Sequence, residues 1–380
     1  MDGTRREIID VHVHVGLKGD QWPQLGHFSK AYQKELLYKV FLFYAGIKES
    51  EVADSLLKTK TLENIVASHV DKVVCLALDH VYDIKGKPHP ARSHVWVANK
   101  YIVDHLRKEL PDRILFGASI HPYDDNFGAR VKKCVDDGAV LVKWLPSAQQ
   151  IDLAEDKTGL AMKILATAGP NGKPLPLLVH TGAEYAIPSS DERTGSYNFL
   201  SWSWKDKLDN RFRFKKPWHT PRVQRIHENL RAALDEGAVI IFAHCGLPYF
   251  LSGPIGRHLE HSDFDVVKGF LEDTAAGKFK GRCYADVSAL ATPFRRLFFR
   301  DIRRLPPQLL LFGSDFPTPV FELSADLKEM REDFEAVLKG DFTRIIIPQD
   351  NLIDVNHREL RHFFPGHPMF TNFGRMIGQR

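Results

Sequence analysis

Short apolar runs recur along the chain, and each leads through a polar residue to glycine or proline before a longer polar and amphipathic stretch begins. Runs this short and this rich in Val, Ile and Leu are typical of strands that are buried on both faces of a parallel sheet. The runs span residues 7–16, 71–80, 113–122, 138–146, 175–182, 237–246, 282–290 and 309–317.

The stretches between these runs have the character of helices. Examples are residues 50–69, 92–109, 156–168, 221–236 and 321–338. A strand that alternates with a helix predicts βαβ units. Eight strands with polar residues at the same end predict a (β/α)₈ TIM barrel, and an open doubly wound sheet is the alternative.

The chain is longer than a plain barrel, which takes about 250 residues. It has 380 residues, and the excess gathers in residues 16–50, 184–220 and 339–380. The first two segments follow strands, so we expect lid insertions at the C-terminal face, where barrel enzymes keep their active sites. We expect the third to be a helical extension packed against the barrel, and residues 1–380 to form one domain.

The charge of the chain bears on its partners. The net charge is +4, from 52 basic and 48 acidic residues, so neither a nucleic acid nor a membrane is expected as a partner. The apolar stretch 36–47 is shorter than the roughly 20 residues that span a bilayer, and we interpret it as a lid or as a contact in a homo-oligomer. The N-terminus lacks the apolar core of a signal peptide, and the four scattered cysteines suit reduced thiols, so we expect a cytoplasmic protein.

A histidine pair ends the first run. His12 and His14 are two residues apart, so in a strand both imidazoles point to the same face. A pair of histidines is costly to bury without a purpose, and imidazole is the commonest protein metal ligand. For this pair alone, metal binding and a structural role both remain open.

Other strand ends carry similar side chains, each two or three residues before a glycine or proline. They are Lys143, His180, His244 and Asp315. Closing the barrel would bring all these ends to one rim. Three or four N and O ligands with an open position make a catalytic zinc site, so the spacing predicts a metal centre there.

Five of these strand ends resemble a known family. The motifs are DVHVHVG, VKWLP, LLVHTG, FAHCG and GSDFP. Together they resemble the amidohydrolase superfamily of metal-dependent (β/α)₈ barrels, and most closely its amidohydrolase-2 branch of hydrolases and aminocarboxymuconate-semialdehyde-type decarboxylases. The resemblance covers roughly residues 7–320 and leaves out both insertions.

The resemblance implies a set of metal ligands. His12 and His14 would hold the first ion with Asp315, and His180 would complete a mononuclear site. In dinuclear members a carboxylated strand-four lysine, here Lys143, bridges two ions, and His180 and His244 would hold the second. We expect one or two divalent ions, with zinc first, although Mn²⁺ and Fe²⁺ suit such ligands equally.

The chemistry follows from charge. A divalent ion lowers the pKa of bound water to about 7, Asp315 can carry that water's proton, and His244 can stabilise an oxyanion unless it is itself a ligand. We therefore expect a hydrolase for an amide, ester or lactone-type bond of a small carboxylated substrate. A non-oxidative decarboxylase or hydratase is the first alternative, and a non-catalytic metal-binding barrel is the second. Hydrolysis is favoured because a decarboxylase needs an arginine to bind the departing carboxylate, and the strand ends carry none. Such an arginine would have to come from the lids or from the segment around Arg222 and Arg225.

Substrate contacts are expected from the second insertion. Its aromatic and basic residues, including Trp204, Arg211 and Arg213, suit an anionic small-molecule substrate. Basic residues among aromatics also occur in single-strand binding proteins, but the nearly balanced charge and the lack of an RNA-binding module argue against a nucleic acid. His121 ends the third run and could contact substrate, and Asp286 ends the seventh and could support a metal-binding histidine.

Overall fold

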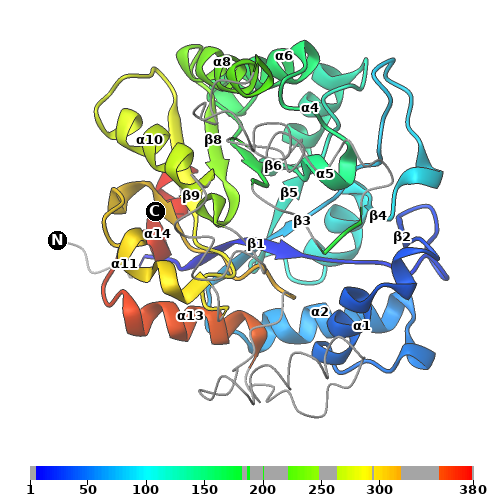
Figure 1. Ribbon diagram of the computed structural model, residues 1–380. Coiled ribbons are helices and arrows are strands. Elements are labelled where there is room, and N and C mark those ends of the chain that lie inside the picture. The colour runs from blue at the N-terminus through cyan, green and yellow to red at the C-terminus, as the bar shows by residue number, and fades with distance from the viewer. Residues whose placement is uncertain are drawn as a thin grey trace, which may run out of the picture.

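The computed structural model describes residues 6–181, 186–188, 200, 221–247, 263–292, 295–317 and 351–378. Its main sheet has eight parallel strands, one in each predicted run, and their spatial order follows their order along the chain (Figure 1). The strands are β1 (Ile9–His14), β3 (Lys72–Leu76), β5 (Ile114–Ala118), β6 (Ala139–Trp144), β7 (Leu177–Val179), β8 (Val239–Phe242), β9 (Arg282–Asp286) and β10 (Leu310–Leu311).

Backbone hydrogen bonds join the last strand region to the first. Val11 N donates to Phe312 O at 3.0 Å, and Asp315 N donates to His12 O at 2.9 Å. Val13 and Phe316 also form a parallel bridge. The sheet therefore closes on itself, which confirms the (β/α)₈ barrel and excludes the open doubly wound sheet.

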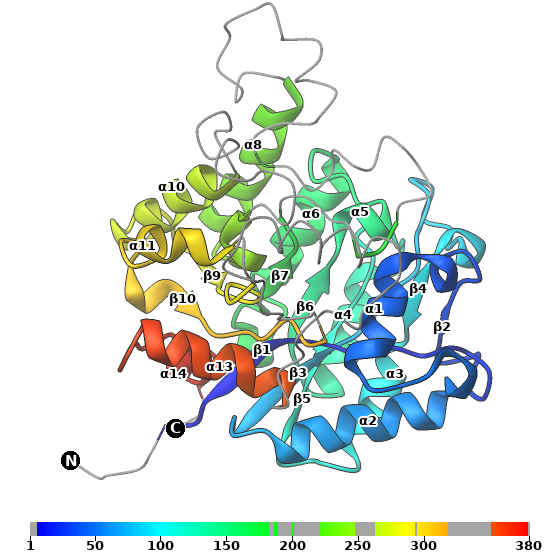
Figure 2. The same ribbon diagram turned by 60° about the horizontal axis from the view of Figure 1, so that its bottom comes forward.

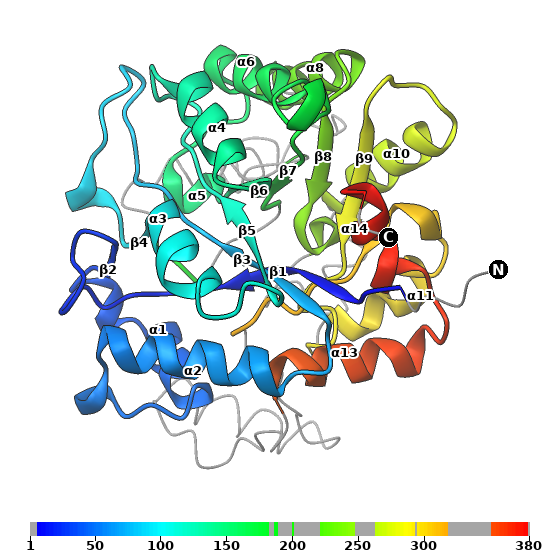
Figure 3. The same cartoon turned by 180° about the vertical axis from the view of Figure 1, so that it is seen from behind.

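Helices surround the barrel (Figures 1 and 3). They are α2 (Asp54–Ala67), α3 (Asn99–Tyr101), which continues as a π-helical segment (Ile102–Arg107), α4 (Phe127–Asp136), α5 (Pro146–Gln149), α6 (Asp156–Leu165), α8 (Pro221–Asp235), α10 (Asp263–Ala275) and α11 (Phe299–Ile302). Helices are confirmed within 50–69, 156–168 and 221–236, whereas 321–338 lies outside the described residues. The helix predicted over 92–109 is wrong in its first part, because residues 95–97 form a strand.

That strand pairs with a strand of the first insertion. β4 (Val95–Val97) pairs antiparallel with β2 (Gly26–Phe28), and α1 (Leu36–Tyr44) follows β2 along the chain (Figure 2). The buried side chains Tyr38, Leu42 and Phe28 belong to one small hydrophobic cluster. The apolar segment 36–47 is therefore packed within its own chain, as the lid interpretation expected.

The C-terminal extension packs against the barrel through α13 (Leu352–Phe363) and α14 (Met369–Met376), coloured orange to red in Figures 1–3. The side chain of Asn372 donates to Leu310 O at 2.9 Å, and Phe312 N donates to Met369 O at 3.1 Å. These bonds tie the extension to β10 and the residue after it. In the described part of the chain, no helix combines the length and the apolar character that crossing a bilayer requires.

Candidate active site

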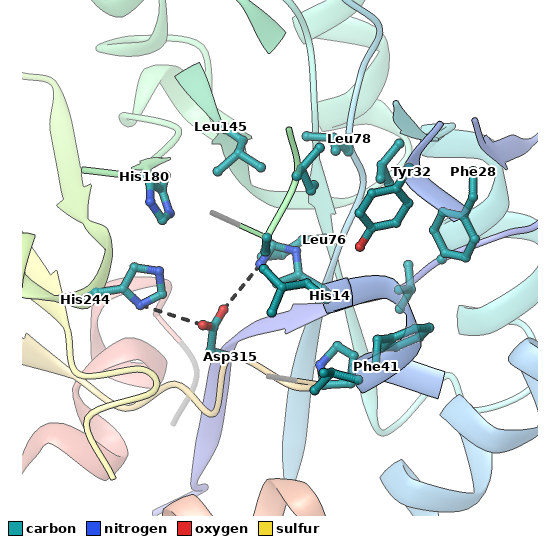
Figure 4. Close-up of a pocket in the computed structure, with 18 of the residues that line it drawn as sticks. His14, Phe28, Tyr32, Phe41, Leu76, Leu78, Leu145, His180, His244 and Asp315 are labelled. Atoms are coloured by element: carbon teal, nitrogen blue, oxygen red, sulfur yellow. Dashed lines mark ion pairs between the residues drawn. The ribbon is translucent and has the colours of Figure 1, made fainter. Parts of the chain in front are cut away.

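Three side chains, those of His12, His14 and Asp315, converge where β1 ends and the chain leaves β10. Figure 4 shows two of them, His14 and Asp315. Nε2 of His12 and Nε2 of His14 lie 3.1 Å apart, and Oδ1 of Asp315 lies 3.5 Å from the first nitrogen and 3.4 Å from the second. All three ligand atoms lie within 4.8 Å of one another. The strand periodicity expected for His12 and His14 therefore brings both imidazoles to one point, and barrel closure adds the carboxylate.

The backbone fixes Asp315 in this position. Its N–H donates to the carbonyl of His12, and its φ of 62° places it in the left-handed region, which aspartate tolerates better than most residues. The side chain thereby turns back toward β1.

A second carboxylate orients His12. Nδ1 of His12 donates to Oδ2 of Asp286 at 2.9 Å, so the lone pair of Nε2 faces His14. Ser288 lies beside them, with Oγ 3.1 Å from Nδ1 of His12 and 2.8 Å from Nδ1 of His244. A carboxylate that binds the far nitrogen of a histidine is the usual support of a metal ligand. The structure thus places Asp286 in the supporting position that the sequence suggested.

Electrostatics keep these groups in ligand form. Burial lowers the pKa of His12 to about 4, and the charge of Lys143 acts in the same direction. Burial alone would raise the pKa of Asp315, but His244, His12 and His14 hold it well below its usual range. The neutral imidazole of His12 beside an ionised carboxylate gives donors of the kind that a divalent ion requires.

The spacing also suits an ion. Two ligands that each lie about 2.0–2.1 Å from one ion, at a right angle, are separated by about 3 Å. The Nε2 atoms of His12 and His14 are 3.1 Å apart. The donors of His12, His14 and Asp315 therefore fit one divalent ion in both chemistry and separation.

Lys143 lies at the same point. It is fully buried on β6, and its Nζ lies 3.0 Å from Nε2 of His12. A lysine in this position is close enough to the histidine pair to serve as a bridging ligand if carboxylated. Carboxylation of Lys143 and the number of ions stay predictions.

His180 and His244 lie on the neighbouring strands. His180 directly follows β7, His244 lies in a tight turn after β8 with φ 54°, and their ring centroids are 4.9 Å apart. Burial lowers the pKa of His244 to about 3. His244 also forms a second possible ligand group with His12 and Asp286, whereas His180 belongs to neither of the groups found among the described residues.

A cavity of about 140 Å³ opens beside these residues. Its polar lining residues include candidate metal ligands and one arginine. They are His14, His180, His244, Asp315 and Arg295. Apolar residues dominate the rest of its wall. The described lining residues there are Val15, Gly16, Phe28, Tyr32, Leu37, Val40, Phe41, Leu76, Leu78, Val95, Leu145, Ala186, Ile187 and Pro317. The first insertion contributes Phe28 to Phe41, so residues from 16–50 do cover the predicted site.

Several predicted substrate contacts lie elsewhere. His121 is fully buried, bonds through Nε2 to Gln149 O at 2.9 Å, and is not among the residues that line the cavity. Arg222 pairs with Asp152 at 3.0 Å, and Arg225 pairs with Asp156, so both arginines are engaged on α8 outside the cavity wall. The remaining predicted contacts, Trp204, Arg211 and Arg213, lie outside the described residues.

The sequence interpretation missed two residues of the site. Ser288 is two residues after Asp286, so the strand-like spacing that identified the histidine pair could have found it. Arg295 lines the cavity although it is nine residues beyond the end of β9. Arg295 does not end a strand, so the strand-end pattern could not identify it. The expectation that such an arginine comes from the lids or from the segment around Arg222 and Arg225 was wrong.

Comparisons with known proteins were made on sequence and on structure. No family model and no curated protein matches the chain. Solved structures that match include IDCase from Metarhizium anisopliae, at 13% identity and a TM-score of 0.46, covering 100% of this chain and 99% of the other. A manganese-bound 5-carboxyvanillate decarboxylase from Novosphingobium aromaticivorans matches at 13% identity and a TM-score of 0.44, covering 87% and 91%.

A third solved structure is the amidohydrolase 2 from Bifidobacterium longum subsp. infantis. It is 12% identical, with a TM-score of 0.46, and the match covers 98% of this chain and 99% of the other. At these identities and TM-scores the similarities give no information about the reaction or the substrate. Inferences about both are drawn from the site described above. The Bifidobacterium protein carries the name of the branch that the strand-end motifs of this chain resemble.

Proposed function

We propose that this chain is a metal-dependent enzyme of the amidohydrolase type, a hydrolase that cleaves an amide, ester or lactone-type bond of a small carboxylated substrate. The observation that carries the proposal is the convergence of His12, His14 and Asp315 beside a cavity. Barrel enzymes hold their sites at this C-terminal face. The four cysteines are buried and free, which suits the cytoplasm.

The same three residues would hold a divalent ion, with zinc as the first candidate. Lys143 and the two later histidines would add ligands if a second ion is present. Such an ion lowers the pKa of bound water to about 7 and so supplies hydroxide at neutral pH. Asp286 keeps His12 in the tautomer that leaves Nε2 available.

Asp315 and His244 would move protons and stabilise charge. Oδ2 of Asp315 lies 3.9 Å from Nδ1 of His244, and both residues line the cavity. The pKa of Asp315 is well below its usual range, so its carboxylate is ionised at neutral pH. Its position at the proposed ion site, rather than its basicity, would let it take a proton from bound water and pass it to a leaving group. His244 would polarise the reacting carbonyl or stabilise its oxyanion.

Non-oxidative decarboxylation is the second candidate, and Arg295 is the observation that favours it. A decarboxylase must grip the departing carboxylate, and a guanidinium suits that task. Arg295 lines the cavity, and its Nη1 lies 3.5 Å from the backbone oxygen of Ser288, whose hydroxyl contacts His244. The absence of a strand-end arginine therefore no longer argues for hydrolysis.

A product screen separates the two reactions. The metal-loaded protein is incubated in oxygen-18 water with carboxylated lactones, amides and aromatic acids, and both CO₂ and the isotope content of products are measured. Hydrolysis predicts one solvent oxygen in the product and no CO₂. Reproducible CO₂ release without solvent oxygen would establish decarboxylation instead, and neither signal from any substrate class would contradict both.

A further inference from the structure

Two successive peptide groups lead from β10 into Asp315. They join Gly313 to Ser314 and Ser314 to Asp315, and both Ser314 and Asp315 are buried. Their orientation decides where the carboxylate of Asp315 points, because this residue has a φ of 62°, in a small region that few residues with a side chain adopt. A residue in that region keeps its conformation where the surrounding structure over-determines the backbone.

The first strand of the barrel holds the N–H ends of these two peptide groups. Ser314 N donates to Oδ1 of Asp10 at 2.9 Å, and the same oxygen accepts the N–H of His12 at 3.0 Å. Asp315 N donates to the carbonyl of His12 at 2.9 Å. Asp10 is fully buried. β1 therefore fixes both N–H groups next to the strand end that carries the histidine pair.

One side chain of the C-terminal extension holds the opposite, carbonyl ends. Nδ2 of Asn356 in α13 donates to Gly313 O at 2.6 Å and to Ser314 O at 3.4 Å. An amide NH₂ group carries two hydrogens, so a single asparagine can serve two carbonyls. Asn356 is fully buried. Each of the two peptide groups is therefore held at both ends, by β1 through its N–H and by α13 through its C=O.

The same side chain reaches a neighbouring segment of the site. Oδ1 of Asn356 accepts the N–H of Ala291 at 3.3 Å. Ala291 lies in the segment after β9 that also carries Ser288, whose hydroxyl lies 3.1 Å from Nδ1 of His12. All three bonds of this asparagine go to backbone groups. Asn356 thus joins the segment of Asp315 to the segment of Ser288 and acts on the site through the backbone.

We propose that Asn356 is a positioning residue of the ion site, which keeps the carboxylate of Asp315 directed at the histidine pair by holding the two peptide groups before it. The C-terminal extension then completes the site in addition to covering the barrel. This inference rests on the proposed function, because it concerns the ion that His12, His14 and Asp315 would hold.

Asn372 provides a matched control within the same extension. It is also a buried asparagine, and its Nδ2 donates to two backbone carbonyls, Pro307 O and Leu310 O, each at 2.9 Å. These carbonyls lie before β10 and at its first residue, at the opposite end from Asp315. Leucine in place of either asparagine leaves buried carbonyls unpaired and so lowers stability, but only Asn356 holds the segment of Asp315.

Zinc binding by the full chain tests the inference. The protein is stripped of metal and titrated with Zn²⁺ against a competing chelator. We expect Asn356→Leu to bind Zn²⁺ about 10–100-fold more weakly than the wild type, which is the usual cost of losing the support of a metal ligand. Asn372→Leu should bind Zn²⁺ as tightly as the wild type. Urea unfolding of the metal-free proteins measures stability separately, and we expect a loss in both variants.

Cobalt gives a readout that a purely structural role would not move. The visible absorption of bound Co²⁺ depends on the number and arrangement of its ligands, so it should change in Asn356→Leu and match the wild type in Asn372→Leu. Asn356→Asp is the second variant if the leucine variant does not fold. It keeps the size of the side chain and the acceptor for Ala291 but loses both donors, so we expect the same changes, with Asn372→Asp as its control.

The outcomes separate this inference from the proposed function. Wild-type zinc affinity and an unchanged cobalt spectrum in a folded Asn356 variant would overturn the inference alone. An equal loss of zinc affinity in the Asn372 variants would also overturn it, because the whole extension would then support the site. If neither Asn356 variant folds while both Asn372 variants do, the residue serves stability and the inference is wrong. A wild type that takes up neither Zn²⁺ nor Co²⁺ would refute the proposed function and the inference with it.

Discussion

Asp286 accepts a hydrogen bond from Nδ1 of His12 at 2.9 Å, and both side chains are fully buried. Its other oxygen accepts from the backbone N–H groups of His244 and Ser288, each at 3.0 Å. One carboxylate at the end of β9 thus orients a histidine on β1 and the turn that carries His244. The histidine tautomer is set by this contact across the barrel.

Replacing Asp286 with Asn should weaken metal binding by about 10–100-fold, because an amide is a weaker acceptor and no longer favours the Nδ1–H tautomer. A titration with a competing chelator measures the effect. Asp79→Asn is the control, since Asp79 is also buried but pairs with Arg130 at 2.9 Å and does not line the cavity. An unchanged affinity in Asp286→Asn would show that the contact is only structural.

Asp315→Asn should reduce kcat by at least about 10²-fold with either reaction class, since it removes a metal ligand and the group that carries the proton. Asparagine tolerates a φ of 62°, so the backbone can stay as it is. Steady-state kinetics and thermal unfolding on the same sample check both points. A variant with nearly wild-type kcat would exclude Asp315 from the chemistry.

Gly313→Ala should damage the site without altering any ligand. A Cβ at Gly313 would lie 2.9 Å from Cβ of His12 and 3.0 Å from Cβ of Ser288, where neither neighbour has a flexible end to move. We expect a loss of about 1–3 kcal/mol of stability and lower metal occupancy. A Cβ added at Gly128 in α4 would have no neighbouring atom within 4 Å, so Gly128→Ala should retain both the stability and the metal occupancy of the wild type. Full metal occupancy in Gly313→Ala would contradict this geometry.

The pH dependence of stability should include a contribution from His121. Burial lowers its pKa to about 3, from an ordinary value near 6.5. Because the folded-state pKa is the lower one, the stabilisation is complete above pH 6.5 and is lost as the pH falls toward 3, by about 1.4 kcal/mol per unit.

His121→Phe removes the titrating group and keeps a ring between Tyr82 and Tyr123, whose centroids each lie 4.8 Å from that of His121. Urea unfolding between pH 6 and pH 4 should therefore show a shallower decline for the variant, with parallel curves above pH 7. An equally steep decline would mean that His121 is protonated in the folded protein.

The barrel could be predicted from the sequence because each of its strands is largely buried and lies in a short run that is rich in apolar residues. The shared orientation of the histidine pair could also be predicted from the sequence, since a spacing of two puts His12 and His14 on one side of any strand. The convergence with Asp315 required only that the sheet close.

Other features depend on contacts between distant segments and left no local pattern. The strands of the β2–β4 pair have three residues each, too few for a visible alternation. Arg295 and Arg296 are equivalent in the sequence, and only the fold places the first in the cavity wall and the second on Glu359 of the C-terminal extension. The roles of Trp204, Arg211 and Arg213 stay predictions.

Metal content per chain, measured by mass spectrometry after purification with zinc or manganese supplementation, tests the central claim that His12, His14 and Asp315 hold a divalent ion. We predict at least one equivalent in the wild type, retention in Arg296→Gln, and loss of at least one equivalent in His14→Ala with the fold intact by circular dichroism. A wild-type protein without a bound ion, or a His14→Ala variant with wild-type occupancy, would contradict the claim.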